Sequence, residues 1–190
     1  MLLGCCCCAA LAARELPSWW LAFPNLARLE SPFTQESDSA VFGKLRRDGT
    51  LRLAQGGRLR VEYRKGMLLV CDGQNLVQYD PQARTAQRLR LRSAAQEAPL
   101  LNVLMNPKSL SATYEAKAGP EPGSVLLVPR KPGLPQVQLD GEQFLKRIQW
   151  TDGTGARQVI LLQAPHLPGA FDPALFTFKA PAGTRWINTP

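Results

Sequence analysis

Cationic and apolar residues alternate with a period of two along residues 44–92. The clearest runs are Leu51-Arg52-Leu53, the stretch RLRVEYR at residues 58–64 and the stretch RLRLR at residues 88–92. A period of two places successive side chains on opposite faces of a β-strand. The chain is therefore expected to build a sheet with one basic face and one apolar face, and the apolar face has to be covered.

Short strands with turn signals between them are expected along most of the chain. Asp48-Gly49, Gly56-Gly57, Lys65-Gly66 and Asp72-Gly73 are typical of tight turns between antiparallel strands. We expect strands at residues 32–40, 44–53, 58–64, 67–71, 76–80, 85–92, 125–128, 136–139, 144–151, 158–163 and 176–179. Such a sheet can close, pack on a second sheet, or curve around something else.

Two helices accompany the predicted sheet. One is expected near residues 18–28, limited by Pro17 and Pro24. The other is expected within residues 96–110, where Leu100, Leu101, Leu104 and Met105 have helical spacing. Because this second helix interrupts the meander, it suits a plug or lid laid across a concave face.

The positive charge is concentrated on the predicted basic face. Residues 44–92 hold the whole formal net charge of +8. Strands that bind single-stranded nucleic acid carry stacking aromatic residues among their cations, and only Tyr63 and Tyr79 are candidates here. We therefore expect no nucleic-acid partner. A solvated face, anionic lipid headgroups and an acidic protein partner remain open.

The N-terminal segment is predicted to be a targeting signal. Residues 1–13 are uncharged, too short to span a bilayer, and end in the small-x-small pattern Ala10-Leu11-Ala12. We interpret residues 1–12 as a signal peptide, possibly truncated at its start, and residues 13–190 as a single domain. Leu2-Leu3-Gly4-Cys5 also resembles a lipobox. Cleavage after Ala12 would leave Cys71 as a single thiol, best interpreted as a small buried residue.

Catalytic chemistry is not expected. His166 is the single histidine and lies in a Pro-flanked loop without paired acids nearby. Asp72 and Asp80 are isolated turn residues rather than a general acid and base. Four adjacent thiols at 5–8 have poor spacing for a metal. We expect no enzymatic activity, no cofactor and no metal site.

Several short motifs occur in order along the chain: Phe33-Thr-Gln35, Gly49-Thr-Leu-Arg-Leu53, Gly57-Arg-Leu-Arg-Val-Glu-Tyr63, Leu69-Val-Cys-Asp-Gly73, Leu76-Val-Gln-Tyr-Asp-Pro81 and the segment at residues 172–183 (DPALFTFKAPAG). Their order and spacing resemble a known family, the periplasmic outer-membrane lipoprotein carriers (LolA). The resemblance covers roughly residues 18–188.

This resemblance implies a mainly β fold: an antiparallel, unclosed half β-barrel of about 10–11 strands, with a helical lid over a hydrophobic cavity and a short N-terminal helix. It also implies transport of acylated lipoproteins through the periplasm, from an inner-membrane release complex to an outer-membrane acceptor. We expect the carrier to be a monomer. Gln55 stands where the family has a lid-contacting arginine, and Cys71 where a serine is usual.

The expected ligand site combines a lid and a cavity wall. Leu100, Leu101, Leu104 and Met105 are the predicted lid face. The predicted wall consists of the apolar strand residues Leu51, Leu53, Leu59, Val61, Tyr63, Leu68, Val70, Val77, Tyr79, Leu89, Leu91, Leu126, Val128, Ile148, Trp150, Ile160 and Leu162.

Two other functions are compatible with these residues. The same cavity could carry another lipid-like cargo, such as a lipid or pigment precursor. The same fold could also serve as an interaction module that senses lipoproteins, although a sensor would be expected to carry an additional partner-binding domain.

Overall fold

The computed structural model describes residues 15–90, 103–105 and 107–187. Their strands are β1 (Arg28–Ser39), β2 (Gly43–Ala54), β3 (Arg58–Tyr63), β4 (Leu68–Asp72), β5 (Asn75–Asp80), β6 (Thr85–Arg90), β7 (Tyr114–Ala118), β8 (Ser124–Pro129), β9 (Val137–Gly141), β10 (Leu145–Thr151), β11 (Arg157–Leu162) and β12 (Arg185–Ile187). The helical elements are α1 (Ser18–Ala22), α4 (Leu110–Thr113) and the 3-10 helices η1 (Phe23–Asn25), η2 (Pro107–Ser109) and η3 (Pro173–Phe176).

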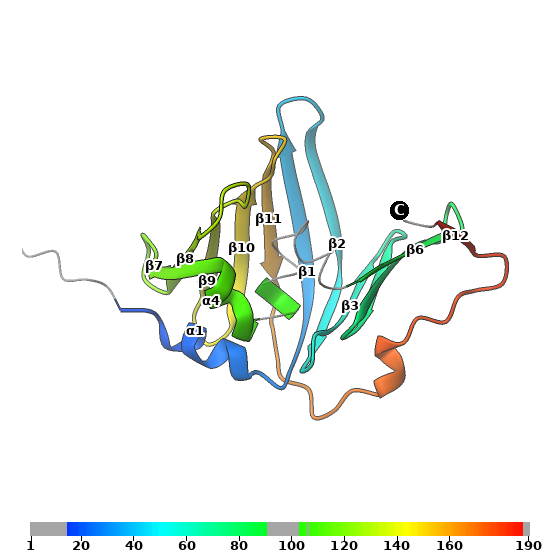
Figure 1. Cartoon of the computed structure of the whole chain (residues 1–190), viewed down its shortest axis with the longest axis horizontal. Coiled ribbons are helices and arrows are strands. Elements are labelled where there is room, and N and C mark those ends of the chain that lie inside the picture. Colours follow the sequence, from blue (N-terminus) through cyan, green and yellow to red (C-terminus); the bar gives the residue numbers. More distant parts are fainter. Residues whose placement is uncertain (1–14, 91–102, 106, 188–190) are drawn as a thin grey trace, which may run out of the picture.

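All twelve strands of the described residues form one sheet, in the order β12-β6-β5-β4-β3-β2-β1-β11-β10-β9-β8-β7. The sheet is curved and does not close, so β12 and β7 are its two edges, and its two halves face each other across a concave side (Figure 1). The prediction of a mainly β, unclosed antiparallel sheet is confirmed. The β12–β6 pair is parallel, which the sequence pattern did not indicate.

The central pair of strands is the longest. β1 and β2 pair from Arg28 opposite Ala54 to Ser39 opposite Gly43, and β1 also pairs with β11. This pairing joins the first half of the sheet to the second. The far end of the β1–β2 hairpin projects beyond the neighbouring strands (Figure 1).

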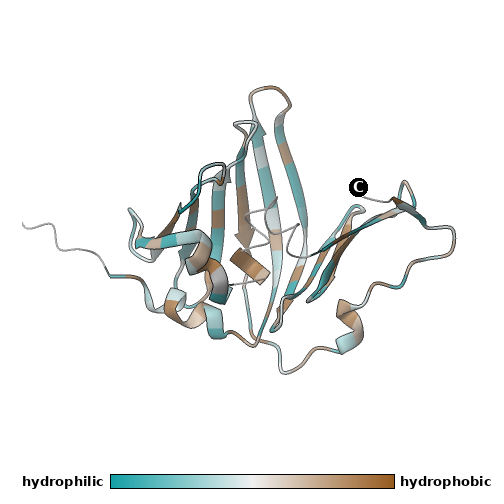
Figure 2. Ribbon diagram, viewed as in Figure 1, coloured by the Kyte–Doolittle hydropathy of each residue, from teal (hydrophilic) through white to brown (hydrophobic). Residues whose placement is uncertain are grey.

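Alternation decides which face each side chain occupies. Hydrophobic and hydrophilic bands alternate along the strands (Figure 2). On β3, Leu59 and Val61 are buried in the main hydrophobic cluster, whereas Arg60 lies on the opposite face. We call the face that carries Leu59 the concave face, and the face that carries Arg60 the convex face.

The N-terminal helix docks through its aromatic residues. Trp19 and Trp20 of α1 and Phe23 of η1 are buried together, and the Trp19 indole donates a 2.8 Å hydrogen bond to the carbonyl oxygen of Gly123. A Cβ on Gly141 would lie 2.7 Å from the Trp19 ring, so glycine is required there. The helix predicted over 18–28 is shorter: α1 ends at Ala22, and the chain continues as the 3-10 turn η1, which holds Pro24.

The C-terminal segment crosses the convex face of β3–β6. Arg58 lies over the Phe176 ring, 5.6 Å from its centroid, and Arg88 lies over Trp186 at 4.9 Å. Phe178 packs against Tyr79 with ring centroids 5.4 Å apart. The expected strand at residues 176–179 is wrong, because this stretch leaves η3 without strand pairing.

The interrupting helix is only partly within the described residues. Residues 103–105 are helical, and η2 and α4 follow before β7, a strand that the sequence pattern did not predict. The start of that helix and the end of the predicted strand 85–92 lie outside the described residues. None of the helices in the described part of the chain is long and apolar enough to span a membrane.

Candidate functional site

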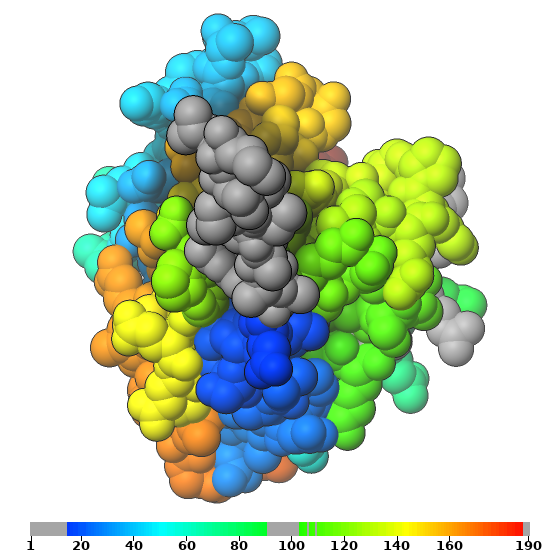
Figure 3. All heavy atoms as spheres, turned by 90° about the vertical axis from the view of Figure 1, so that its left-hand side faces the viewer, coloured from blue at the N-terminus to red at the C-terminus, as the bar shows by residue number. Residues whose placement is uncertain are grey.

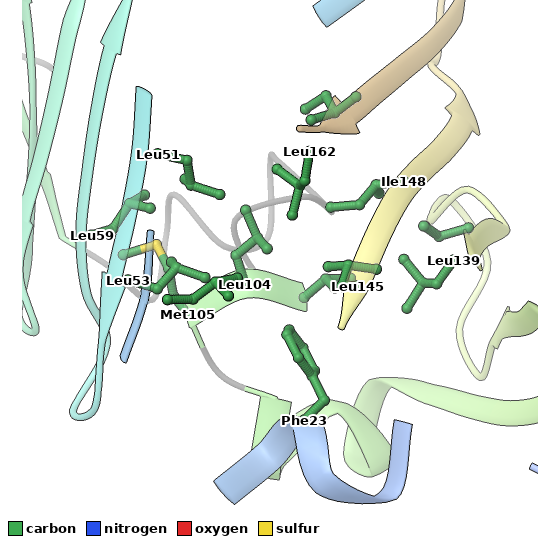
Figure 4. Packing of buried hydrophobic residues seen from close by; sticks show 14 of the residues in the cluster. Phe23, Leu51, Leu53, Leu59, Leu104, Met105, Leu139, Leu145, Ile148 and Leu162 are labelled. Carbon is green, nitrogen blue, oxygen red and sulfur yellow. The ribbon is translucent and has the colours of Figure 1, made fainter. Parts of the chain in front are cut away.

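The helical residues 103–105 insert into the concave side of the sheet. Val103, Leu104 and Met105 are buried in the main hydrophobic cluster. Figure 4 shows Leu104 and Met105 between the side chains from β2 and β3 and those from β10 and β11. They therefore occupy the space between the two halves of the sheet, which is the position predicted for a lid.

A cavity of about 300 Å³ remains beside these residues. It lies where β2 ends, between η1 and the helical residues. Its lining consists of Phe23, Pro24, Leu26, Arg28, Leu29, Leu53, Ala54, Gln55, Gly56, Gly57, Leu104, Met105, Pro107 and Lys108. The lining is mostly apolar, with two cations and the exposed Gln55 at its rim.

Ten of the predicted wall residues lie on the concave face and belong to, or pack against, the main cluster. They are Leu51, Leu53, Leu59, Val61, Tyr63, Leu89, Ile148, Trp150, Ile160 and Leu162. Cross-strand pairing explains their shared face, since Leu51 lies opposite Val61 and Ile148 lies opposite Ile160. The structure thus brings residues from β2, β3, β6, β10 and β11 onto one apolar surface.

The structure places six predicted wall residues on the convex face, so their assignment to the wall is wrong. Leu68 pairs with Tyr79, and Val70 pairs with Val77, on the side of the sheet that packs against Phe178. Leu126 and Val128 alternate with Val125 and Leu127, and it is the latter two that enter the main cluster. In both places apolar residues occupy both faces of a strand.

Several concave-face residues were missed by sequence reasoning. Leu69, Cys71 and Leu76 take the wall positions on β4 and β5, because Val61 pairs with Leu69 and Leu59 pairs with Cys71. In the second half the missed residues are Val125, Leu127, Val137, Leu139 and Leu145. The alternation along β3 is unambiguous. Following it through the strand pairings to β4 and then to β5 would have identified the first three residues. The predicted Leu91, Leu100 and Leu101 lie outside the described residues.

Gln55 occupies the turn expected to hold a lid latch. Its backbone N–H donates to the carbonyl oxygen of Ala27 at 3.0 Å, and its own carbonyl oxygen accepts a 3.0 Å bond from Arg58 Nε. Gly56 and Gly57 follow with φ of 82° and 73°, so the turn needs glycine at these positions. The turn is therefore held by its backbone, with Gln55 at the cavity rim.

Few polar groups lie among the apolar residues of the concave face, and Arg47, opposite Gln35, is a cation close enough to act on Tyr63. The Tyr63 hydroxyl donates a 2.7 Å hydrogen bond to Gln35 Oε1, and burial raises the pKa of Tyr63. Burial also raises the pKa of the Cys71 thiol to about 11. The described residues contain no cluster of three or more groups that could hold a metal ion. This surface is suited to hold apolar chains.

The convex face carries a charged network rather than a fully solvated stripe. Arg52 bridges Glu30 and Glu62, and Arg60 pairs with Glu62 at 2.8 Å. Burial alone would raise the pKa of Glu62, but the hydrogen bonds and charges of Arg60 and Arg52 outweigh it and hold that pKa below its ordinary value. The predicted basic face thus exists, but part of it is covered by the C-terminal segment.

His166 lies in an exposed loop. It lies beside β1, where its backbone exchanges two 3.0 Å hydrogen bonds with Glu30.

The curved sheet, its apolar concave face and the inserted helical residues match a known family. A sequence model described as outer membrane lipoprotein carrier protein LolA matches residues 25–179. The chain belongs to this family. It is also 27% identical over 148 residues to an outer-membrane lipoprotein carrier protein of Chromohalobacter salexigens, an alignment that covers 74% of this chain and 70% of that protein.

Solved structures support the same fold for this LolA family member. A LolA superfamily protein from Nitrosomonas europaea superposes with a TM-score of 0.51 at 12% identity, covering 80% of this chain and 90% of the other. An uncharacterized conserved protein from Thermus thermophilus superposes with a TM-score of 0.52 at 11% identity, covering 90% and 95%. At these identities the likeness concerns the fold alone.

Proposed function

We propose that this chain is a periplasmic carrier that holds the acyl chains of lipoproteins against the concave face and shuttles them from the inner to the outer membrane. The observation that carries this proposal is the insertion of Leu104 and Met105 between the two apolar halves of an unclosed sheet. Family membership and the lipoprotein carrier relative support the same cargo class.

The energetics require such an insertion. Each buried methylene contributes about 0.8 kcal/mol, so one acyl chain of about sixteen carbons would stabilise a complex by on the order of 12 kcal/mol. A carrier bound that tightly would release its cargo too slowly. The empty site must therefore be filled by something that the cargo has to displace.

Leu104 and Met105 provide that competition. Burying each side chain stabilises the empty carrier by about 1.5–3 kcal/mol. Displacing both would lower the affinity for cargo by about a thousand-fold, since each 1.4 kcal/mol is a factor of ten. Binding and release of the cargo therefore need no bond to be made or broken.

The partners follow from the same proposal. Loading requires a release complex at the inner membrane, and delivery requires an acceptor at the outer membrane. The described wall and helical residues all come from one chain, and we propose that the carrier acts as a monomer. A closing contact such as the family's latch would have to work with Gln55 at the cavity rim.

Depletion tests the transport role. When the protein is depleted in its host, fractionation should show lipoproteins accumulating in the inner membrane at the expense of the outer membrane. An unchanged distribution would contradict the carrier role. Mass spectrometry of ligand that co-purifies with the protein distinguishes the cargo, because a bound triacylated protein supports lipoprotein transport and a free lipid or pigment precursor argues for the other cargo.

Locking the insertion tests the site. Leu53 and Met105 line the same cavity, so Leu53→Cys with Met105→Cys, in a Cys71→Ala background, should form a crosslink on oxidation. The oxidised protein should fail to take up lipoprotein, and the same protein after reduction should take it up. Equal uptake before and after reduction of a crosslink that has formed would contradict the role of residues 103–105.

A further inference from the structure

The end of the β1–β2 hairpin holds two apolar side chains away from the rest of the protein. The strands remain paired up to Ser39 opposite Gly43. Ser39 Oγ accepts hydrogen bonds of 3.3 Å from the backbone N–H groups of Val41 and Phe42, and Gly43 follows with φ of +69°. The turn is therefore ordered by its own hydrogen bonds.

These apolar side chains have no role in the fold. Val41 is 81% exposed and Phe42 is 89% exposed, and Leu45 near the start of β2 is half exposed. Turns at hairpin ends are normally built from Gly, Asn, Asp, Ser or Pro. A valine and a phenylalanine at this place cost solubility without adding to the hydrophobic clusters, which favours a contact outside the chain.

Cations lie directly behind the apolar end. Lys44 and Arg46 are exposed, and so is Arg47. The first two each form an exposed ion pair, Lys44 with Asp38 at 3.9 Å and Arg46 with Glu36 at 3.5 Å. Exposed pairs of this kind contribute little, so both cations can exchange these partners for phosphate groups.

We propose that this hairpin tip, defined as Val41, Phe42 and Leu45 with Lys44 and Arg46, docks on the surface of a membrane that contains anionic lipid. The apolar side chains enter the boundary between headgroups and acyl chains, and the two cations bind the phosphates. In both views the tip is the top of the molecule (Figures 1 and 3), so it reaches a flat surface first.

The shape of the tip favours a lipid surface over a protein. A stable protein interface buries about 800 Å² on each partner, which a single convex turn does not supply. A bilayer surface deforms around such a turn and closes over it. The tip also lies at the opposite end of β2 from Ala54 and the cavity rim, so docking leaves the rim uncovered.

This inference goes beyond the proposed carrier function, because it requires no cargo. It is tested by co-sedimentation of the full chain with vesicles at low ionic strength, comparing an equimolar mixture of phosphatidylglycerol and phosphatidylcholine with phosphatidylcholine alone. The wild-type protein should bind the mixed vesicles more tightly. Val41→Ser with Phe42→Ser should weaken that binding by about ten-fold or more.

The charge variant gives an independent readout. Lys44→Ser with Arg46→Ser should weaken binding to the mixed vesicles by about five-fold for each cation and leave binding to phosphatidylcholine alone unchanged. The matched control is Leu21→Ser with Leu167→Ser, which removes two exposed apolar side chains elsewhere. Its affinity for the vesicles should stay within about two-fold of the wild-type value.

Three results would overturn the proposal: no binding of the wild-type protein to mixed vesicles, unchanged binding of the Val41/Phe42 variant, or an equal loss in the Leu21/Leu167 control. Because the side chains of the hairpin tip are exposed, the variants at the tip should keep the wild-type midpoint of thermal unfolding. Because no lipoprotein is present in the measurement, a negative result contradicts membrane docking alone and leaves the carrier proposal to the fractionation experiment.

Discussion

Arg60 on β3 and Leu175 on η3 are 115 residues apart in the sequence, and the Arg60 guanidinium donates a 3.0 Å hydrogen bond to the Leu175 carbonyl oxygen. The same guanidinium pairs with Glu62, so one side chain joins the C-terminal segment to the charged network of the convex face. The Arg60 side chain is only 19% exposed as a result.

Replacing Arg60 should weaken this attachment. Arg60→Met removes the bond to Leu175 and leaves Glu62 with one partner fewer, which should lower the free energy of unfolding by about 1–3 kcal/mol. For a chain of this size each 1 kcal/mol lowers the midpoint of thermal unfolding by about 2–4 °C. Arg90→Met, at an exposed convex position on β6, is the control and should change little. Equal midpoints for the two variants would contradict the attachment.

The charged network also predicts a dependence on pH. The pKa of Glu62 lies below its ordinary value of 4.5, so ionised Glu62 stabilises the folded state. This contribution is fully present above the ordinary value and is lost as the pH falls through the lowered pKa. Urea unfolding should therefore show wild type more stable than Glu62→Gln at pH 7, with the difference shrinking below pH 4.5. A difference that grows in acid would contradict the assignment.

Cys71 should be inert in the folded protein. Its side chain is fully buried on the concave face, and burial raises its pKa to about 11, so almost no thiolate is present at neutral pH. Alkylation followed by peptide mass spectrometry should detect modified Cys71 only after unfolding. Modification of the native protein at a rate comparable to that in denaturant would show that the β3–β5 region opens readily.

Alternation in the sequence predicted the faces of β3 and of the second half of β2 correctly, because charged and apolar residues alternate along RLRVEY and around Arg52. Leu51 and Leu53 could only point inward when Arg52 points outward. The same reasoning failed on β4, where Leu68, Leu69, Val70 and Cys71 are all apolar and alternation does not distinguish the two faces.

The reason for this ambiguity lies elsewhere in the chain. The convex side of β4–β6 is apolar where Phe178 covers it, with Val77 and Tyr79 beneath. A contact across about a hundred residues leaves no local pattern in the sequence. The parallel strand β12 was missed for the same reason, since its three residues pair with β6 without a turn between them.

Shortening the inserted side chains should strengthen acyl binding. Leu104→Ala with Met105→Ala removes most of what fills the site, so titration with a fluorescent fatty acid should show an affinity at least about ten-fold higher than that of the wild type. The control is Phe176→Ala, a buried residue of η3 that packs on the convex face and does not line the cavity. Each of these substitutions should cost about 2–5 kcal/mol of stability, but only the Leu104/Met105 variant should bind the fatty acid more tightly. Unchanged or weaker binding would contradict the competition.

The central claim is that acyl chains of lipoproteins lie on the concave face, and photo-crosslinking tests it most directly. Tyr63 is half-buried on the concave face beside Phe33, whereas Leu126 is half-buried on the convex face. With a benzophenone side chain at either position in the host, we predict that the Tyr63 variant crosslinks to lipoprotein and the Leu126 variant does not. Equal crosslinking at both positions, or none at Tyr63, would contradict the account.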